Sequence, residues 1–277
     1  MRKQFLSLAL LFFVLPSLKA QWMYSFKDAQ KLAVATNKLI LIDFTASWCG
    51  PCRMMDANTW STPKVQTLMK KFVSVKIDID KDREIANRYS IRSIPDIFIV
   101  DANGEIIYRS KGYKDKNRMS LILEKYFLNT KFLQKELIAY YKKPTGNNAL
   151  ALAYKYIDFS IFISKNRKKK ILKLSNNYIY KAKKLYKKEG NKHKREQQIA
   201  LLTIYKSLVK EKFKKVITAL ESNFKEDEIK EKNKPLYHFL YFTAYMKLKN
   251  KKSAKTWYQK LIKNKDTKMW LLKSRKI

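Results

Sequence analysis

The segment Trp48-Cys49-Gly50-Pro51-Cys52 holds both cysteines of the chain. It follows a nearly continuous apolar run, residues 38–44, in which the one acid is Asp43. Such a run is typical of a strand that is covered on both faces, as in an α/β sheet. We therefore predict a buried strand over 38–44 and a helix that begins at the first cysteine.

The spacing of the two cysteines predicts their chemistry. Thiols three residues apart on the first turn of a helix can close a small disulfide ring, and the helix N-terminus favours the thiolate of Cys49. A purely structural disulfide and half of a zinc site are the alternatives. Zinc needs four ligands, and the other soft candidates, His193 and His238, lie far along the sequence. We expect no metal, and no cofactor besides a redox-active Cys49–Cys52 disulfide.

Helix and strand patterns alternate on both sides of this segment. Ser25 and Asp28 form a capping box that opens the first helix. Further helices are predicted over 63–72, over 82–89 and from 115 or 117 to 128, and further strands over 73–79, 97–100 and 105–109. The turn Asn103-Gly104 between the last two strands is a strong hairpin signal. The order α-β-α-β-α-β-β-α predicts an α/β fold.

The two halves of the chain differ in charge. The 277 residues include 61 Lys and Arg against 23 Asp and Glu, and 46% are hydrophobic, which is enough to build a core. Residues 21–130 carry a net charge of +6, whereas residues 131–277 carry +29. The shift near residue 130 predicts a boundary between a first domain, 21–130, and a second, 131–277, each of ordinary domain size.

The second half has an all-helical pattern with loops predicted at 144–147, 190–191 and 233–235. Four residues have the spacing of a tetratricopeptide repeat: Ala244, Tyr245, Ala254 and Tyr258. A degenerate second copy lies about 38 residues earlier, against a usual period of about 34. Tetratricopeptide-like hairpins and a generic helical bundle both remain open. The excess of lysine is either a solvated surface or a site for an anionic envelope surface or an acidic protein.

The first twenty residues have the pattern of a secretory signal peptide. Arg2 and Lys3 precede a mostly apolar run, residues 5–15, and Ala20 precedes the expected cleavage. An uncleaved anchor is the alternative, but the run is shorter than the roughly 20 residues that span a bilayer. We expect a periplasmic or secreted protein in an oxidising compartment, where a cysteine pair matters and nucleic acid is not a natural ligand.

Five spaced motifs resemble the thioredoxin family. Besides the cysteine segment and its strand, they are Val75-Lys76-Ile77-Asp78-Ile79-Asp80, Tyr89-Ser90-Ile91-Arg92-Ser93-Ile94-Pro95, Ala102-Asn103-Gly104-Glu105 and Lys111-Gly112-Tyr113. The resemblance covers roughly residues 25–128 and implies a thioredoxin fold, a central mixed sheet flanked by helices. Residues 54–65 are more similar to periplasmic thioredoxin-like reductases. Thr45 and Asp96 replace a usual Trp and a usual Thr, which bears on substrate preference.

The resemblance implies catalytic roles for four residues. Cys49 would be the attacking thiolate, and Cys52 would resolve the mixed disulfide. Asp43, buried near Cys52 and paired with Lys76 of the next strand, would have a raised pKa and take the proton of Cys52. An ordinary ion pair between Asp43 and Lys76 is the alternative.

The resemblance also implies a substrate-binding surface. Its residues would be Trp48, Gly50, Pro51, Ile94, Pro95 and Gly112. The peptide bond before Pro95 would be cis, and the backbone of Ile94 would hold an extended substrate strand. In this family the Gly-Pro dipeptide goes with a reducing centre.

These expectations favour a thiol–disulfide oxidoreductase of the cell envelope that reduces disulfides of client proteins. A membrane partner would supply its electrons, and the helical domain would bind a partner or a client. Two alternatives remain. One is a helical scaffold protein with a redox-silent thioredoxin-like domain, and the other is a disulfide isomerase, which would need a more oxidising centre.

Overall fold

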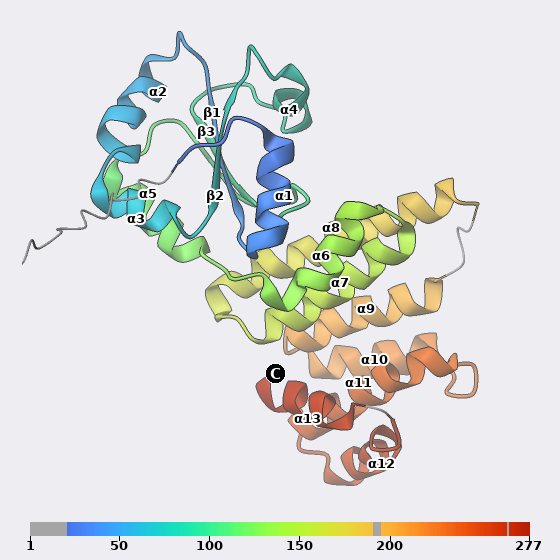
Figure 1. Cartoon of the computed structure of the whole chain (residues 1–277). Coiled ribbons are helices and arrows are strands. Elements are labelled where there is room, and N and C mark those ends of the chain that lie inside the picture. Colours follow the sequence, from blue (N-terminus) through green and yellow to red (C-terminus); the bar gives the residue numbers. More distant parts are fainter. Residues whose placement is uncertain (1–20, 191–194, 265) are drawn as a thin grey trace, which may run out of the picture.

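The computed structural model describes residues 21–190, 195–264 and 266–277, so that the predicted signal peptide and His193 lie outside the described residues. The first half is built on a four-stranded mixed sheet in the order β2-β1-β3-β4 (Figure 1). The strands are β1 (Ile40–Thr45), β2 (Val73–Asp78), β3 (Asp96–Val100) and β4 (Ile106–Lys111). β1 pairs parallel with β2 and antiparallel with β3, which in turn pairs antiparallel with β4.

Helices cover both faces of this sheet. They are α1 (Phe26–Thr36), α2 (Gly50–Met55), α3 (Pro63–Met69), α4 (Arg83–Arg88) and α5 (Lys116–Tyr126), with a π-helical turn η1 (Asp56–Trp60) after α2. Because side chains alternate along a strand, Ile40 and Ile42 pack with α1, whereas Leu39 and Leu41 pack on the other face with α3 and α5. The predicted α/β thioredoxin fold is confirmed.

Short polar residues set where these helices begin. The side chains of Ser25, Asp82 and Asp115 accept hydrogen bonds from the first free backbone amides of α1, α4 and α5. Asn37 ends α1 in the left-handed conformation, with φ 56°. The first strand therefore begins at Ile40, two residues later than predicted.

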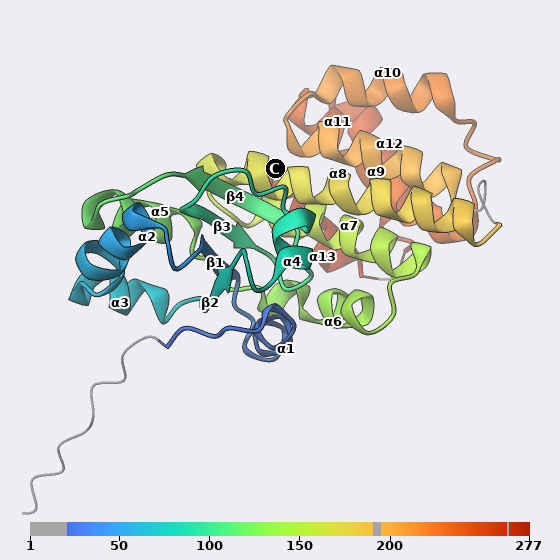
Figure 2. The same cartoon turned by 90° about the horizontal axis from the view of Figure 1, so that it is seen from above.

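Both edges of the sheet are covered. At the β2 edge, Met23 exchanges two backbone hydrogen bonds with the strand, each of 2.9 Å. At the other edge, α8 (Lys165–Lys188) runs beside β4 (Figure 2). Asn177 and Lys181 of α8 hold the Glu105 carboxylate at 2.9 and 2.7 Å. An open edge strand can pair with other chains, so this cover limits such pairing.

The second half of the described chain is all-helical, as predicted. Its remaining helices are α6 (Gln134–Lys142), α7 (Gly146–Ile161), α9 (Glu196–Val209), α10 (Phe213–Asn223), α11 (Lys234–Lys247), α12 (Lys251–Leu261) and α13 (Thr267–Lys276), with short 3-10 turns at Lys131–Leu133 and Glu231–Asn233. One buried apolar cluster continues from the sheet into these helices. Among the described residues, none of the helices has the length and apolar character to cross a bilayer.

Two helical hairpins in this half match in helix length and turn conformation. α9 and α11 have 14 residues each, and α10 and α12 have 11 each. Glu196 and Lys234, which begin the two hairpins, are 38 residues apart. The turns also match, because Glu211 and Lys249 both adopt the left-handed conformation, with φ 61° and 60°. The 38-residue spacing seen in the sequence is therefore a structural period.

Two loops are shorter than predicted. Instead of a loop over 144–147, α7 begins at Gly146, because the Thr145 side chain caps it by accepting the N–H of Asn148 at 3.3 Å. Instead of a loop over 233–235, Pro235 lies in the first turn of α11. A proline fits there because the N–H that it lacks has no partner in the first turn of any helix.

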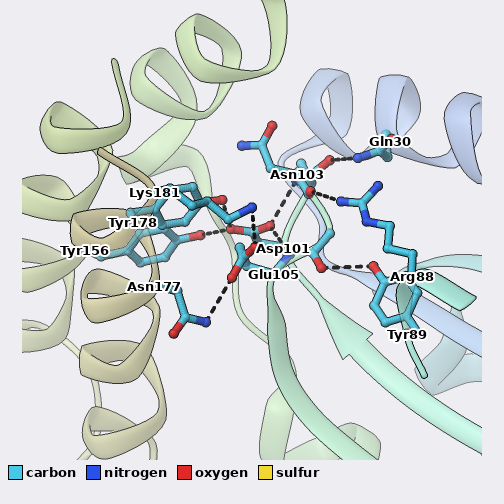
Figure 3. A network of polar contacts seen from close by, with 12 residues as sticks. Gln30, Arg88, Tyr89, Asp101, Asn103, Glu105, Tyr156, Asn177, Tyr178 and Lys181 are labelled. Atoms are coloured by element: carbon cyan, nitrogen blue, oxygen red, sulfur yellow. Dashed lines mark hydrogen bonds and ion pairs between the residues drawn. The ribbon is translucent and has the colours of Figure 1, made fainter. Parts of the chain in front are cut away.

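The turn between β3 and β4 docks into the helical half (Figure 3). The Asp101 carboxylate is buried and accepts hydroxyl hydrogen bonds from Tyr156 of α7, at 2.8 Å, and from Tyr178 of α8, at 2.6 Å. Its other oxygen accepts the backbone N–H groups of Asn103 and Glu105, both at 2.9 Å. The carboxylate therefore links the sheet to two helices with four hydrogen bonds.

This link lies at the end of the sheet opposite the cysteines. Antiparallel pairing sets Val100, beside Asp101, against Ile40 at the beginning of β1. Cys49, in contrast, follows the far end of β1. A strand of six residues is about 20 Å long. The helical half therefore attaches well away from the cysteines and leaves that end of the sheet uncovered by this link.

Candidate active site

The two cysteines form a disulfide at the N-terminus of α2, as predicted, with Cα atoms 5.3 Å apart. Cys49 is the N-cap, and its sulfur accepts the backbone N–H of Cys52 at 3.2 Å. Both side chains are only 3% exposed and pack with Ala46 and Ile94. The same N–H and the positive end of the helix would stabilise a Cys49 thiolate once the disulfide is reduced.

The surface around the disulfide is open and aromatic. Trp48 is 63% exposed, and its indole donates a hydrogen bond of 2.8 Å to Asp80. Pro51 is exposed on the first turn of α2, and a methyl group at Gly50 would meet no atom within 4 Å. The three residues predicted beside the cysteines therefore border solvent, where another protein chain can approach.

A second loop completes this surface. The Ile94–Pro95 peptide bond is cis, as predicted. Ile94 packs against the cysteines and, among the described residues, has no backbone hydrogen-bond partner. Gly112, with φ 75°, donates its N–H to the Pro95 carbonyl at 2.7 Å. This hydrogen bond holds the Ile94–Pro95 loop in place. Gly112 adopts the left-handed conformation, which favours glycine at this position.

Asp43 lies under the active site rather than on its surface. It is 2% exposed and, two residues after Leu41, it points to the face of the sheet that α2 and η1 cover. Strand register sets it opposite Lys76, whose Nζ is 3.7 Å from Asp43 Oδ2. The other carboxylate oxygen and the indole nitrogen of Trp60 make no hydrogen bond of ordinary geometry among the described residues, although the Trp60 indole helps to lower the pKa of Asp43.

This environment shifts the pKa of Asp43. Burial raises the pKa from 3.8 to about 7; Lys76 opposes the rise, and the neighbouring Asp56 carboxylate adds to it. A carboxyl group that changes charge near neutral pH can both accept and return a proton there. The predicted rise in pKa is therefore present, and its main cause is the loss of solvent.

The sequence reasoning missed Asp56. Lys76 forms an ion pair with Asp56 as well as with Asp43, so that it is shared between two carboxylates. Asp56 stands four residues after Cys52, a spacing that brings two side chains to one helix face, and this signal could have identified it. Lys76 and Asp56 also line a groove of about 490 Å³, together with Ser47. The groove connects Lys76, the ion-pair partner of Asp43, with solvent.

Two other candidates lie away from the disulfide chemistry. Asp96, which replaces a usual threonine after the cis proline, is fully buried, and its carboxylate accepts three hydrogen bonds of 2.5–3.1 Å from the Arg109 guanidinium. It therefore holds β3 to β4. His238 lies in the helical half beside Glu226 and Asn264, and burial lowers its pKa. The described residues contain no group of His, Cys, Asp and Glu suited to hold a metal ion.

A disulfide at the start of a helix, next to a cis-proline loop and above a buried carboxylate, defines a thioredoxin-like oxidoreductase. Comparison with known proteins agrees. The model of the thioredoxin-like domain family matches residues 26–127. Thioredoxin from Chlamydia trachomatis serovar D is 38% identical over 91 residues, which are 32% of this chain and 82% of that protein.

Two further thioredoxins are similar to part of this chain. That of Bacillus subtilis is 33% identical over 103 residues, 36% of this chain and 92% of that protein. The crystal structure of thioredoxin NaTrxh from Nicotiana alata is 25% identical and covers 40% of this chain and 97% of that one, with a TM-score of 0.33. The chain belongs to the thioredoxin family, and the family match ends before the helical half.

Proposed function

We propose that this protein reduces disulfide bonds of client proteins with the Cys49–Cys52 dithiol. The observation that carries the proposal is the disulfide at the N-terminus of α2 in a thioredoxin-family domain. The reduced protein would attack a client disulfide with the Cys49 thiolate, which releases one client thiolate and forms a mixed disulfide. Cys52 would then attack the Cys49 sulfur, which releases the second client thiolate and leaves this chain oxidised.

The second step needs a base, and we assign that role to Asp43. Its raised pKa and its face toward α2 support the assignment, because it could take the Cys52 proton as the mixed disulfide breaks. Lys76 would limit the rise in the pKa of Asp43, and its ammonium group would connect this carboxylate with the groove. The surface of Trp48 and the Ile94–Pro95 loop would hold the client as an extended strand, which the unpaired backbone of Ile94 supports.

The direction of electron flow is part of the proposal. The Gly-Pro dipeptide between the cysteines favours a reductant, and a membrane partner would then return the electrons. An isomerase would need a more oxidising centre. A redox-silent scaffold is the less supported alternative, since both cysteines, the cis proline and the buried Asp43 are all in place.

The helical half would serve as the partner-binding module of an envelope protein. The 38-residue repeat of paired helices supports a tetratricopeptide-like arrangement, a type of surface that binds other proteins. Its link through Asp101, at the far end of the sheet, supports a role outside the chemistry. The signal-peptide pattern of residues 1–20 supports a periplasmic or secreted location.

The test is reduction of insulin disulfides by the chain from Gln21 onward, with dithiothreitol as electron source. We expect turnover in the wild type and none in Cys49→Ser, with unchanged circular dichroism. Equal activity in the variant would contradict the assignment of the nucleophile. The reduction potential should lie below about −220 mV, and a value near the about −120 mV of strong oxidants would reverse the direction.

A further inference from the structure

A group of six cations stands at the beginning of α8. Lys165, Lys169, Lys170 and Lys173 are exposed, and Arg167 and Lys168 are half-buried. Among the described residues, none of them lies within ion-pair distance of a carboxylate. Elsewhere in the same half, cations such as Lys260 and Lys273 do have acidic partners. These six charges therefore lack direct ion pairs and repel one another.

A cavity opens beside these cations. It has a volume of about 470 Å³, and its rim is formed largely by Lys165, Lys168, Lys169 and Lys210. The floor contains the apolar side chains of Leu172 and Val209, and Glu211 is the single acid in the lining. A cavity with a cationic rim and an apolar floor suits an amphiphilic anion, whose charge meets the lysines while its apolar part covers the floor.

Three exposed phenylalanines lie next to the same turn. Phe127, Phe132 and Phe162 are 37%, 37% and 38% exposed, although they come from different segments. The rings of Phe132 and Phe162 are 5.8 Å apart, and the Arg167 guanidinium donates a hydrogen bond of 2.9 Å to the Phe127 carbonyl. Lys155 lies 4.2 Å from the centre of the Phe132 ring. We name the three phenylalanines and the six cations the Phe–Lys face.

We propose that the Phe–Lys face docks the protein onto an anionic phospholipid surface. Five of its six cations are lysines, a residue that is depleted in protein–protein interfaces, where arginine is enriched. Lysine beside phenylalanine is instead the composition of surfaces that lie on membranes, where the rings enter the headgroup region and the ammonium groups meet phosphates. The positive charge of the whole half complements such a surface and would draw it near.

The proposal does not depend on the disulfide. Apart from Phe127, the residues of the face lie in the helical half, and none of them takes part in thiol exchange, so a Cys49→Ser variant should bind vesicles like the wild type. Docking at this face would hold the protein beside a membrane while the cysteines remain accessible.

The test measures binding of the chain from Gln21 onward to vesicles of phosphatidylcholine with about 30% phosphatidylglycerol. We expect binding to these vesicles and none to phosphatidylcholine alone. Each lysine near an anionic membrane contributes about a fivefold gain, so Lys165→Gln, Lys168→Gln and Lys169→Gln together should weaken binding by about 100-fold. Phe162→Ser should weaken it by about tenfold, also in high salt, because its contribution is apolar.

The matched control removes three exposed lysines of α12 with Lys251→Gln, Lys252→Gln and Lys255→Gln. It changes the net charge equally and should weaken binding far less. An equal loss in both triple variants would overturn the proposal, since general charge would then explain the binding. Binding to polyglutamate but not to vesicles would overturn it in favour of an acidic protein partner. Unchanged circular dichroism in every variant shows that each one folds.

Discussion

Asp43 and Asp101 are two buried carboxylates at different places on the same sheet, and they differ in how many hydrogen bonds they accept. Asp101 accepts four, two from tyrosine hydroxyls and two from backbone amides. Asp43 has one ammonium group at 3.7 Å and, among the described residues, an oxygen that accepts no hydrogen bond of ordinary geometry. Burial raises the pKa of both, to about 6 for Asp101 and to about 7 for Asp43.

The difference separates a structural carboxylate from a chemical one. A buried polar group that is fully hydrogen-bonded holds its surroundings in one arrangement, whereas an unsatisfied one destabilises the fold and persists where it has a use. Asp101 joins the sheet to α7 and α8, far from the cysteines. Asp43 faces α2 under the disulfide, where an awkward charge that can take up a proton is useful.

The largest effect on stability should come from removing Asp101, the structural carboxylate of the two. Asp101→Ala leaves the hydroxyls of Tyr156 and Tyr178 and two backbone amides buried without an acceptor. We expect the free energy of unfolding to fall by about 3 kcal/mol, measured by urea denaturation. Tyr156→Phe, which removes one of the four donors, should lower it by about 1 kcal/mol. A neutral surface change alters stability by less than about 0.5 kcal/mol. A loss that small in Asp101→Ala would show that the link between the sheet and the helical half does not depend on this carboxylate.

Asp43→Asn should have the opposite effect on stability and a large effect on chemistry. Because a poorly solvated charge is removed, the free energy of unfolding should rise, while resolution of the mixed disulfide by Cys52 should slow about 10- to 100-fold. Attack by Cys49 should change little. Stopped-flow measurement of the two steps separates them, and an unchanged resolution rate with lower stability would make Asp43 a structural ion-pair member.

The pH dependence of stability gives this variant a second readout. Both carboxyl groups have a folded-state pKa above the unfolded value of 3.8, so the folded protein binds more protons and stability falls as pH rises. For Asp101 the fall ends near pH 6, and for Asp43 near pH 7. The decline between pH 6 and 7 should therefore be weaker in Asp43→Asn than in the wild type.

Much of the sheet and of the disulfide site could be predicted from the sequence because their signals are local. The apolar run before Cys49, the helix that follows and the hairpin at Asn103-Gly104 each depend on neighbours in the chain. Asp56 also had a local signal, its spacing of four from Cys52. The raised pKa of Asp43 followed from one fact, a lone acid within a buried strand.

The link between Asp101 and the helical half could not be predicted in the same way. Its partners Tyr156 and Tyr178 are 55 and 77 residues away, and nothing in the order of residues pairs a turn aspartate with two tyrosines of distant helices. The loop predicted at Pro235 failed for a different reason, since proline both ends and begins helices. Tertiary contacts decide such cases, and these are set by packing rather than by local pattern.

The smallest effect should come from Asp56, which tunes Asp43 through the lysine that the two share. The Asp56 carboxylate raises the pKa of Asp43, and it also draws Lys76 toward itself. Asp56→Asn removes both influences, so the pKa of Asp43 should fall and the rising limb of the resolution rate should move to lower pH, by less than about one unit. The resolution rate near neutral pH should change only a few-fold.

Lys76→Met is the matched control for Asp56→Asn. It removes the cation that opposes the rise in the pKa of Asp43, so it should move the rising limb of the resolution rate to higher pH. If both variants shifted the profile in one direction, the opposing roles of these two groups would be wrong. If neither shifted it, burial alone would determine the proton affinity of Asp43.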